Sequence, residues 1–357
     1  MRRRRIVFSV VIQLVLAGCV SSNPSYCADP EICGEGDAGT ILSLDLAESS
    51  VDLSSTGGDL AAVDLATSPL DVSKPGPFST VRIDLKADVN RTNIDLTVIG
   101  PSDDGKEITK RGTPLPWVLL SPGFLTDRKQ YQGYGDRLAS FGIVTVLQKS
   151  PNESNHARYR DDTVGLIGWL LSPMGMGSDR ISGRLDRNRF GLVGHSLGGK
   201  ISFLVAQADP RVKAVLGIDP VDQRDPSAAS GMSKIKLPAG VPIGYLGETV
   251  SQTGGMPCAP ANANYEVLYK ASPSPAFSIT FNGAAHMDFV DNPAMCWNCG
   301  FCGGGTAPKD RTNKLAIKYT AAYFLSTIGG DRRAVDSLSG VDFQKDVTAG
   351  YVKRDAK

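Results

Sequence analysis

The stretch RFGLVGHSLGGKISF, residues 189–203, decides the fold of this chain. Its apolar start predicts a strand, its end begins a predicted helix, and the pentapeptide G-H-S-L-G forms the turn between them. A sharp strand–turn–helix holds the central serine, Ser196, in a strained backbone with its hydroxyl exposed, and the flanking glycines permit close packing. The helix N-terminus adds free N–H groups and the positive end of a dipole. This context predicts that Ser196 is a nucleophile rather than a serine in an ordinary glycine-rich turn.

Short apolar runs alternate with helical patterns on both sides of this turn. Besides the strand before Ser196, the runs that predict buried strands are residues 117–121, 143–148, 213–218, 242–247 and 277–281. Helical patterns cover 131–142, 161–172 and 310–328, as well as the segment that follows Ser196. The earlier segments STVRIDLKA and TNIDLTVIG alternate apolar and polar residues, which is typical of paired antiparallel strands.

Strands that are apolar throughout indicate a parallel sheet covered on both faces. We therefore expect an α/β fold over residues 78–330, with a mostly parallel central sheet, helices on both faces and antiparallel leading strands. Residues 331–357 are expected to form a C-terminal tail.

The chain contains three histidines, so the base that serves Ser196 is sought among few candidates. His195 belongs to the turn itself, and we expect its side chain to point away from the attacking face of the serine. His156 lies in polar sequence before the nucleophile strand and is interpreted as a surface-loop residue. His286, in FNGAAHMDFVDN, follows a predicted strand late in the chain, consistent with the order serine, acid, histidine. His286 is therefore the candidate base.

Two carboxylates compete for the third catalytic position. Asp219 ends the strand KAVLGI, 23 residues after the serine, and Glu248 follows the next strand in YLGETVS. Either could orient the imidazole and stabilise its protonated form. Asp222 and Asp288 are weaker candidates, and Asp288 is interpreted as a local loop ligand or a surface charge. The pattern alone leaves the choice between Asp219 and Glu248 open.

An oxyanion hole requires two preorganised N–H donors. One is the amide of Leu197, directly after the nucleophile. The other is expected from the loop SPGFLTDR after the strand at 117–121, where Gly123 lets the backbone approach. The amide of Phe124 is the second candidate donor, and its ring would wall the acyl pocket. The alternative is an ordinary Pro-Gly turn.

With these residues in hand, residues 80–328 resemble the α/β-hydrolase superfamily. Within it, the chain is similar to chlorophyllases, bacterial cutinase-like polyester hydrolases and platelet-activating-factor acetylhydrolases. The segments AVLGIDPVD and AAHMDFVD look chlorophyllase-like, and there the aspartate of D-P-V and the histidine of H-M-D are the partners of the serine. The resemblance therefore implies Asp219 as the acid, with Glu248 in reserve. The insert CWNCGFCGGG after His286 falls outside the pattern and leaves the natural substrate open.

The N-terminus has the features of an export signal. Four arginines precede an apolar run too short to span a bilayer comfortably, and L-A-G-C follows at 16–19. This ending resembles a bacterial lipobox, which implies a signal peptide at 1–18 and lipidation of Cys19. Residues 19–77 are rich in Ser, Gly, Ala and Asp, and we expect them to form a disordered acidic stalk. The protein is expected to be exported and lipid-anchored to the cell envelope, in the outer membrane and facing the periplasm or the surface.

Six cysteines remain, and an even number outside the cytoplasm favours disulfides. They are Cys27, Cys33, Cys258, Cys296, Cys299 and Cys302. One bridge is expected to join Cys258 to the cluster CWNCGFC, and Cys27 with Cys33 would close a small loop. A metal site in C-x-x-C-x-x-C is the less favoured alternative, so neither a metal nor another cofactor is expected.

The sequence therefore predicts a serine hydrolase of carboxylic esters that uses Ser196, His286 and Asp219. The formal net charge is +1 and no basic stripe with interleaved aromatic residues occurs, so nucleic acid is not an expected partner. The expected partners are a small-molecule, lipid or polymer ester and, through Cys19, a membrane. The alternatives are a non-catalytic binding protein on a hydrolase scaffold and an acyltransferase that uses the same three residues.

Overall fold

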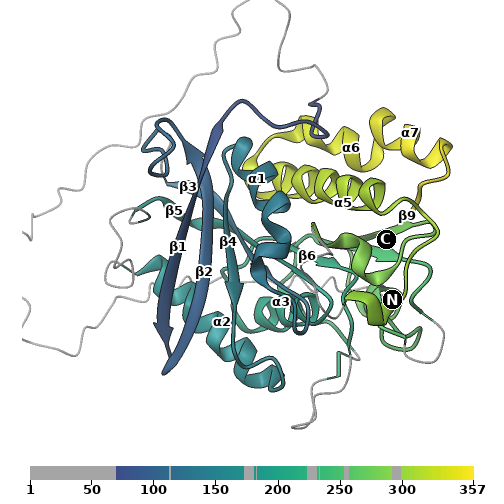
Figure 1. Ribbon diagram of the computed structural model, residues 1–357, viewed down its shortest axis with the longest axis horizontal. Coiled ribbons are helices and arrows are strands. Elements are labelled where there is room, and N and C mark those ends of the chain that lie inside the picture. The colour runs from purple at the N-terminus through teal and green to yellow at the C-terminus, as the bar shows by residue number, and fades with distance from the viewer. Residues whose placement is uncertain are drawn as a thin grey trace, which may run out of the picture. The chain divides into compact units, whose positions relative to one another are not determined.

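A mixed β-sheet with helices on both faces organises the chain (Figure 1). The computed structural model describes residues 70–111, 114–172, 181, 183–222, 231–232, 234–252, 257–291 and 299–357. The predicted signal peptide, Cys19 and nearly all of the predicted stalk lie outside these ranges.

In the described part of the chain, the strands form one sheet in the order β1-β2-β4-β3-β5-β6-β7-β8-β9. They are β1 (Ser79–Val89), β2 (Thr92–Ser102), β3 (Leu115–Ser121), β4 (Val144–Lys149), β5 (Leu185–His195), β6 (Val215–Ile218), β7 (Ile243–Glu248), β8 (Ala276–Phe281) and β9 (Val352–Ala356). The strands from β4 to β8 along this order are parallel, while β1, β2 and β9 pair antiparallel with their neighbours. This arrangement confirms the predicted fold class.

The helices divide between the two faces of the sheet. The α-helices are α1 (Gln132–Ser140), α2 (His156–Leu171), α3 (Leu197–Ala208), α4 (Tyr265–Ala271), α5 (Lys309–Phe324), α6 (Asp336–Ser339) and α7 (Val341–Thr348). Short 3-10 helices are η1 (Arg128–Tyr131), η2 (His286–Phe289), η4 (Cys299–Cys302) and η6 (Arg332–Val335), and α5 continues into a π-helical turn, η5 (Leu325–Gly329). Residues of α2, α3 and α4 join one buried cluster, and residues of α1, α5 and η5 join the other.

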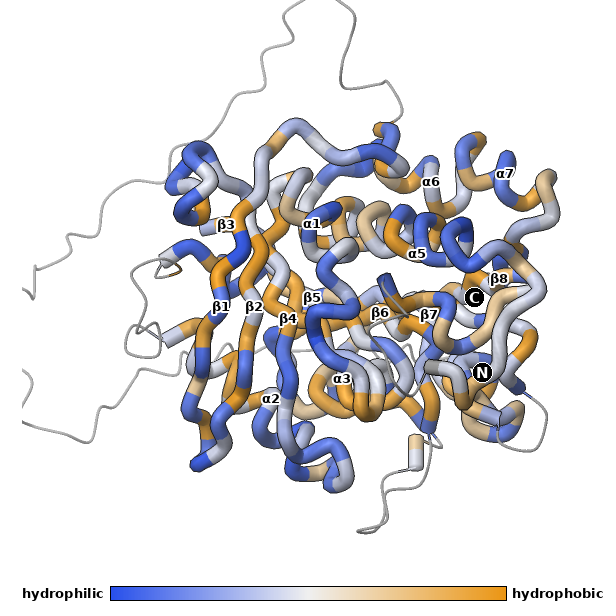
Figure 2. The backbone as a smooth tube through the Cα atoms, in the orientation of Figure 1, coloured by the Kyte–Doolittle hydropathy of each residue, from blue (hydrophilic) through white to orange (hydrophobic). Residues whose placement is uncertain are grey.

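Burial of the strands explains this two-sided arrangement. Every residue of β3, β6 and β7 is buried, whereas β1, at the edge, alternates exposed and buried positions. Hydrophobic residues accordingly follow the inner strands and the helix sides that pack on them (Figure 2). No helix of the described ranges is long and apolar enough to cross a membrane.

Three expectations need correction. Residues 331–357 fold as η6, α6, α7 and the edge strand β9, which pairs with β8, so they are part of the folded domain rather than a tail. The packed chain also begins before residue 78, because Val72 is buried and its carbonyl accepts a hydrogen bond from Arg137. His156 is not a surface-loop residue: it begins α2 and is buried, and Asn155 before it caps the helix by accepting from the amide of Arg158.

Candidate active site

Ser196 occupies a strained turn between β5 and α3. Its φ of 55° and ψ of −120° lie in a region that non-glycine residues rarely adopt. The neighbouring glycines are required by space, because a Cβ on Gly194 would lie 2.2 Å from the Gly198 backbone and one on Gly198 would lie 2.1 Å from the carbonyl oxygen of Ser121. The Ser196 amide donates to the carbonyl of Ile218 at 3.0 Å, which ties the turn to the end of β6.

The carboxyl ends of adjacent parallel strands bring the other candidates to this turn. Asp219 follows β6, Glu248 ends β7, and His286 begins η2 shortly after β8. The Nδ1 atom of His286 lies 2.5 Å from Oδ2 of Asp219, and both side chains are buried. The structure thus pairs His286 with Asp219.

Glu248 is buried beside this pair but has different partners. Its Oε2 accepts hydrogen bonds from the amides of Val250 and Ser251, the latter at 2.7 Å. The hydroxyl of Ser251 in turn accepts from the amide of His286 at 2.9 Å. Glu248 therefore shapes the turn that holds the backbone of the histidine.

Burial sets the ionisation of the site. It lowers the pKa of His286 to about 4, so the imidazole is neutral at neutral pH. Burial raises the pKa of Asp219, while the hydrogen bond from Nδ1–H favours its ionised form. Burial and the nearby Asp219 raise the pKa of Glu248 to about 8, which leaves Glu248 largely protonated at neutral pH. With Nδ1 donating to Asp219, the basic nitrogen of His286 is Nε2.

The loop after β3 approaches the nucleophile closely. A Cβ on Gly123 would lie 3.0 Å from Nδ1 of His195 and 3.3 Å from Cβ of Ser196, so a side chain here would require these neighbours to shift by a few tenths of an ångström. Phe124, the next residue, lines the same pocket as Ser196 and His286. Leu197, the other expected oxyanion donor, is the first residue of α3.

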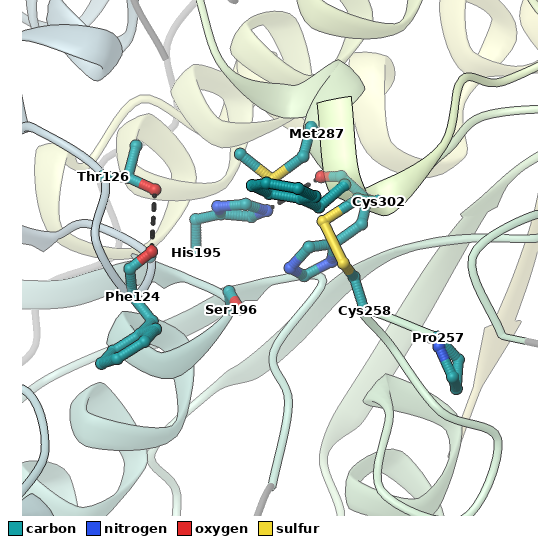
Figure 3. A pocket seen from close by; sticks show the side chains of 11 residues that line it. Phe124, Thr126, His195, Ser196, Pro257, Cys258, Met287 and Cys302 are labelled. Atoms are coloured by element: carbon teal, nitrogen blue, oxygen red, sulfur yellow. Dashed lines mark hydrogen bonds between the residues drawn. A yellow bond between two sulfur atoms is a disulfide. The ribbon is translucent and has the colours of Figure 1, made fainter. Parts of the chain in front are cut away.

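Ser196 and His286 open onto a pocket of about 250 Å³. Figure 3 shows Ser196 between Phe124 on one side and the disulfide of Cys258 with Cys302 on the other. Phe301 also lines the pocket, and 63% of its surface is exposed, against 46% for Phe124. Two exposed aromatic side chains, Phe124 and Phe301, therefore line the pocket.

The bridge between Cys258 and Cys302 confirms that Cys258 pairs with the cysteine cluster. It connects the loop after β7 to the insert after His286. Cys27, Cys33 and Cys296 lie outside the described residues. Among the residues described, no three His, Cys, Asp or Glu side chains are grouped to hold a metal ion.

The weaker acidic candidates have local partners. Asp222 forms an ion pair with the buried Lys200 at 2.9 Å, and Asp288 accepts from the amide of Ala285 at 2.8 Å at the start of η2. His195 forms its hydrogen bonds with groups other than the serine, as expected. Its Nδ1 atom lies 2.8 Å from the hydroxyl oxygen of Tyr131. Sequence reasoning missed Tyr131, Ser251 and Phe301 at the site, because only tertiary packing brings them there.

Comparisons with known proteins show which ester hydrolases the chain resembles. The family described as PETase, PET hydrolase-like, matches residues 107–239, a segment that includes Ser196 and Asp219 but not His286. Chlorophyllase-2 of Arabidopsis thaliana is 30% identical over 200 residues, 50% of this chain and 61% of that protein. Bis(hydroxyethyl) terephthalate hydrolase of Streptomyces coelicolor is 27% identical over 161 residues, 44% of this chain and 45% of that protein. The chain thus spans less than two thirds of the length of either relative.

A ferulic acid esterase from Streptomyces cinnamoneus shares the fold, with a TM-score of 0.55 and 20% identity, over 74% of this chain and 93% of that one. The chain therefore has the α/β-hydrolase fold. The proteins that it resembles in sequence are ester hydrolases of the PET-hydrolase, chlorophyllase and cutinase kinds. Cutinase 1 of Thermobifida cellulosilytica, for example, is 25% identical over 103 residues, 29% of this chain and 38% of that protein.

Proposed function

We propose that this chain is a serine hydrolase that cleaves carboxylic esters with Ser196, His286 and Asp219. The observation that carries the proposal is a buried His286–Asp219 hydrogen bond of 2.5 Å beside a serine in a strained strand–turn–helix, with serine and histidine lining one pocket. The similarity to ester hydrolases supports the same reaction class.

The reaction follows from the residues. The Oγ atom of Ser196 attacks the ester carbonyl carbon while its proton passes to Nε2 of His286, and Asp219 stabilises the resulting imidazolium. The amides of Leu197 and Phe124 donate to the oxyanion of the tetrahedral intermediate. Its collapse expels the alcohol, which takes the proton from His286 and leaves an acyl group on Ser196.

Water completes the cycle through the same histidine. His286 accepts a proton from the water molecule as it attacks the acyl carbonyl, and returns that proton to Ser196 when the acid leaves. The exposed rings of Phe124 and Phe301 at the pocket rim favour esters with an apolar or aromatic part, such as polyester segments or lipid esters. Export and anchoring to a membrane through lipidated Cys19 are part of the proposal and rest on the N-terminal sequence alone.

The test is hydrolysis of p-nitrophenyl esters by the purified chain. Ser196→Ala should lower kcat by more than about 10³-fold and abolish labelling by a fluorophosphonate probe. Ser202→Ala is the matched control, because its buried hydroxyl bonds only to the carbonyl of Gly198 at 2.8 Å and does not line the pocket. Undiminished turnover in folded Ser196→Ala would contradict the proposal. Acyl transfer to an added alcohol in preference to water would identify an acyltransferase instead.

A further inference from the structure

A buried polar chain runs behind the nucleophile and takes no part in the reaction described above. The side chain of His195, directly before Ser196, is completely buried and forms hydrogen bonds with two groups. Its Nδ1 lies 2.8 Å from the hydroxyl of Tyr131, and its Nε2 lies 3.0 Å from the carbonyl oxygen of His286. The Tyr131 hydroxyl also accepts a hydrogen bond from the amide of Gly123 at 3.2 Å.

The direction of each hydrogen bond follows from the chemistry of the groups. Burial lowers the pKa of His195 well below its ordinary value, so the ring is neutral and carries one N–H. The carbonyl of His286 can only accept, so the hydrogen of His195 is on Nε2. The Nδ1 atom then accepts from the Tyr131 hydroxyl, whose oxygen accepts from Gly123.

This series of hydrogen bonds joins three parts of the site that come from distant parts of the sequence. Gly123 precedes the proposed oxyanion donor Phe124, His195 precedes the nucleophile, and His286 is the proposed base. The imidazole rings of His195 and His286 also pack together, with their centroids 4.6 Å apart. Both Tyr131 and His195 are inaccessible to solvent, so water cannot replace a lost partner without rearrangement.

We propose that Tyr131 and His195 are positioning residues that hold the loop of Gly123 and Phe124 and the backbone of His286 in position relative to Ser196. This inference rests on the proposed function. The two residues transfer no proton, because His195 remains neutral and burial raises the pKa of the Tyr131 phenol. They act by geometry: a displacement of about 1 Å at a catalytic group can cost about 10²-fold in rate.

The experiment compares variants of the full chain with p-nitrophenyl esters. Tyr131→Phe removes the hydroxyl that serves both Gly123 and His195, and should lower kcat about 10- to 100-fold with KM changed less than about threefold. The control is Tyr323→Phe, because the Tyr323 hydroxyl is also buried and bonds to the carbonyls of Val215 and Pro242 at 3.0 and 2.7 Å, outside the pocket. It should lower stability without lowering kcat.

Rescue by a conservative variant separates positioning from packing. His195→Leu should lose kcat as Tyr131→Phe does, whereas His195→Gln keeps a side-chain N–H for the carbonyl of His286 and should recover at least about tenfold of that loss. If Tyr131→Phe, or His195→Leu, keeps kcat within about twofold of the parent, or if His195→Gln is no better than His195→Leu, the positioning proposal is wrong. In each case an inactive Ser196→Ala would leave the proposed function standing.

A second measurement uses the parent protein, so it does not depend on whether a variant folds. Because the chain has three histidines, side-chain ¹⁵N spectra of histidine-labelled protein can resolve each ring. We expect one ring in the pure Nε2–H form, with an accepting Nδ1, that does not titrate between pH 5 and 8. If every ring titrates in this range, or no ring is fixed in the Nε2–H form, the proposed chain of hydrogen bonds is wrong.

Discussion

Nδ1 of His286 lies 2.5 Å from Oδ2 of Asp219, although a second buried carboxylate, that of Glu248, ends the neighbouring strand. The Oε2 atom of Glu248 accepts hydrogen bonds from the amides of Val250 and Ser251 in the turn that follows it. One acid therefore faces the imidazole, and the other organises the loop that supports the histidine backbone.

Asp219→Asn should lower kcat for p-nitrophenyl acetate by about 10³- to 10⁴-fold, because an amide neither fixes the correct tautomer of His286 nor stabilises imidazolium. Glu248→Gln is the matched variant and should stay within about tenfold of the parent, since the amide oxygen can still accept from the turn. The opposite ranking of the two variants would make Glu248 the catalytic acid.

The ionisation of Glu248 should affect stability at alkaline pH. Its pKa in the folded state is raised from 4.5 to about 8, so the folded chain binds more protons at this group than the unfolded chain between these pH values. The stability due to this group is full below about pH 4.5 and is lost as the pH rises through about 8. Glu248→Gln cannot ionise, so the Tm of the variant minus that of the parent should increase from pH 5 to pH 9.

Thermal unfolding followed by circular dichroism at several pH values measures this difference. Glu266→Gln is the control, because that carboxylate is partly exposed and pairs with Lys270 on the same helix at 3.8 Å. A Tm difference for Glu248→Gln that is constant from pH 5 to pH 9 would contradict the assigned ionisation.

The bridge between Cys258 and Cys302 should stabilise both the fold and the pocket wall. It links residues 44 apart, and the entropy of closing such a loop corresponds to about 4 kcal/mol of unfolding free energy. Cys258→Ser combined with Cys302→Ser should lower the free energy of unfolding by up to this amount. The KM for bulky esters should rise because both cysteines line the pocket. Denaturant titration and steady-state kinetics check the two effects, and unchanged stability and KM would exclude a role for the bridge.

The nucleophile and the sheet could be predicted because their signals are local. Ser196 lies in a five-residue turn whose glycines are required because a Cβ on Gly198 or Gly194 would lie 2.1 or 2.2 Å from backbone atoms, and the apolar runs mark the buried strands directly. His286 followed from the small number of histidines and from chain order. The fold and the position of the turn therefore needed no information about distant contacts.

The choice of acid and the supporting residues depend on tertiary structure. Since β6 and β7 are adjacent in the sheet, Asp219 and Glu248 both reach the same edge, and their spacing from Ser196 cannot separate them. The structure distinguishes the two acids by their partners: Asp219, at a φ of 40°, pairs with His286, whereas Glu248 accepts hydrogen bonds from the turn that follows it. Likewise, nothing in the sequence around Tyr131 indicates that its hydroxyl meets His195, 64 residues later.

Strand β9 was not predicted from the sequence, for a related reason. Its sequence VKRDA buries only Val352, because an edge strand that pairs on one side can remain polar elsewhere. Its hydrogen bonds are with β8, which precedes it by about 70 residues, so the pairing partner is not apparent from the local pattern.

Phe301 should determine which esters the pocket prefers. Its ring is 63% exposed and lines the pocket from the insert that the disulfide holds. Phe301→Ala should raise KM for p-nitrophenyl esters of long or aromatic acids by about three- to tenfold, the loss of one apolar contact. Short acetyl esters, which do not reach the ring, should keep their KM.

The matched control is Val341→Ala on α7, which removes a 75% exposed apolar side chain outside the pocket. Neither substitution should change the free energy of unfolding by more than about 0.5 kcal/mol, because both side chains are largely exposed. The comparison is therefore one of KM across an acyl series at constant stability. Equal KM changes for acetyl and aromatic esters in Phe301→Ala would show that the ring does not contact the substrate. A change in Val341→Ala like that in Phe301→Ala would show that the effect is not specific to the pocket.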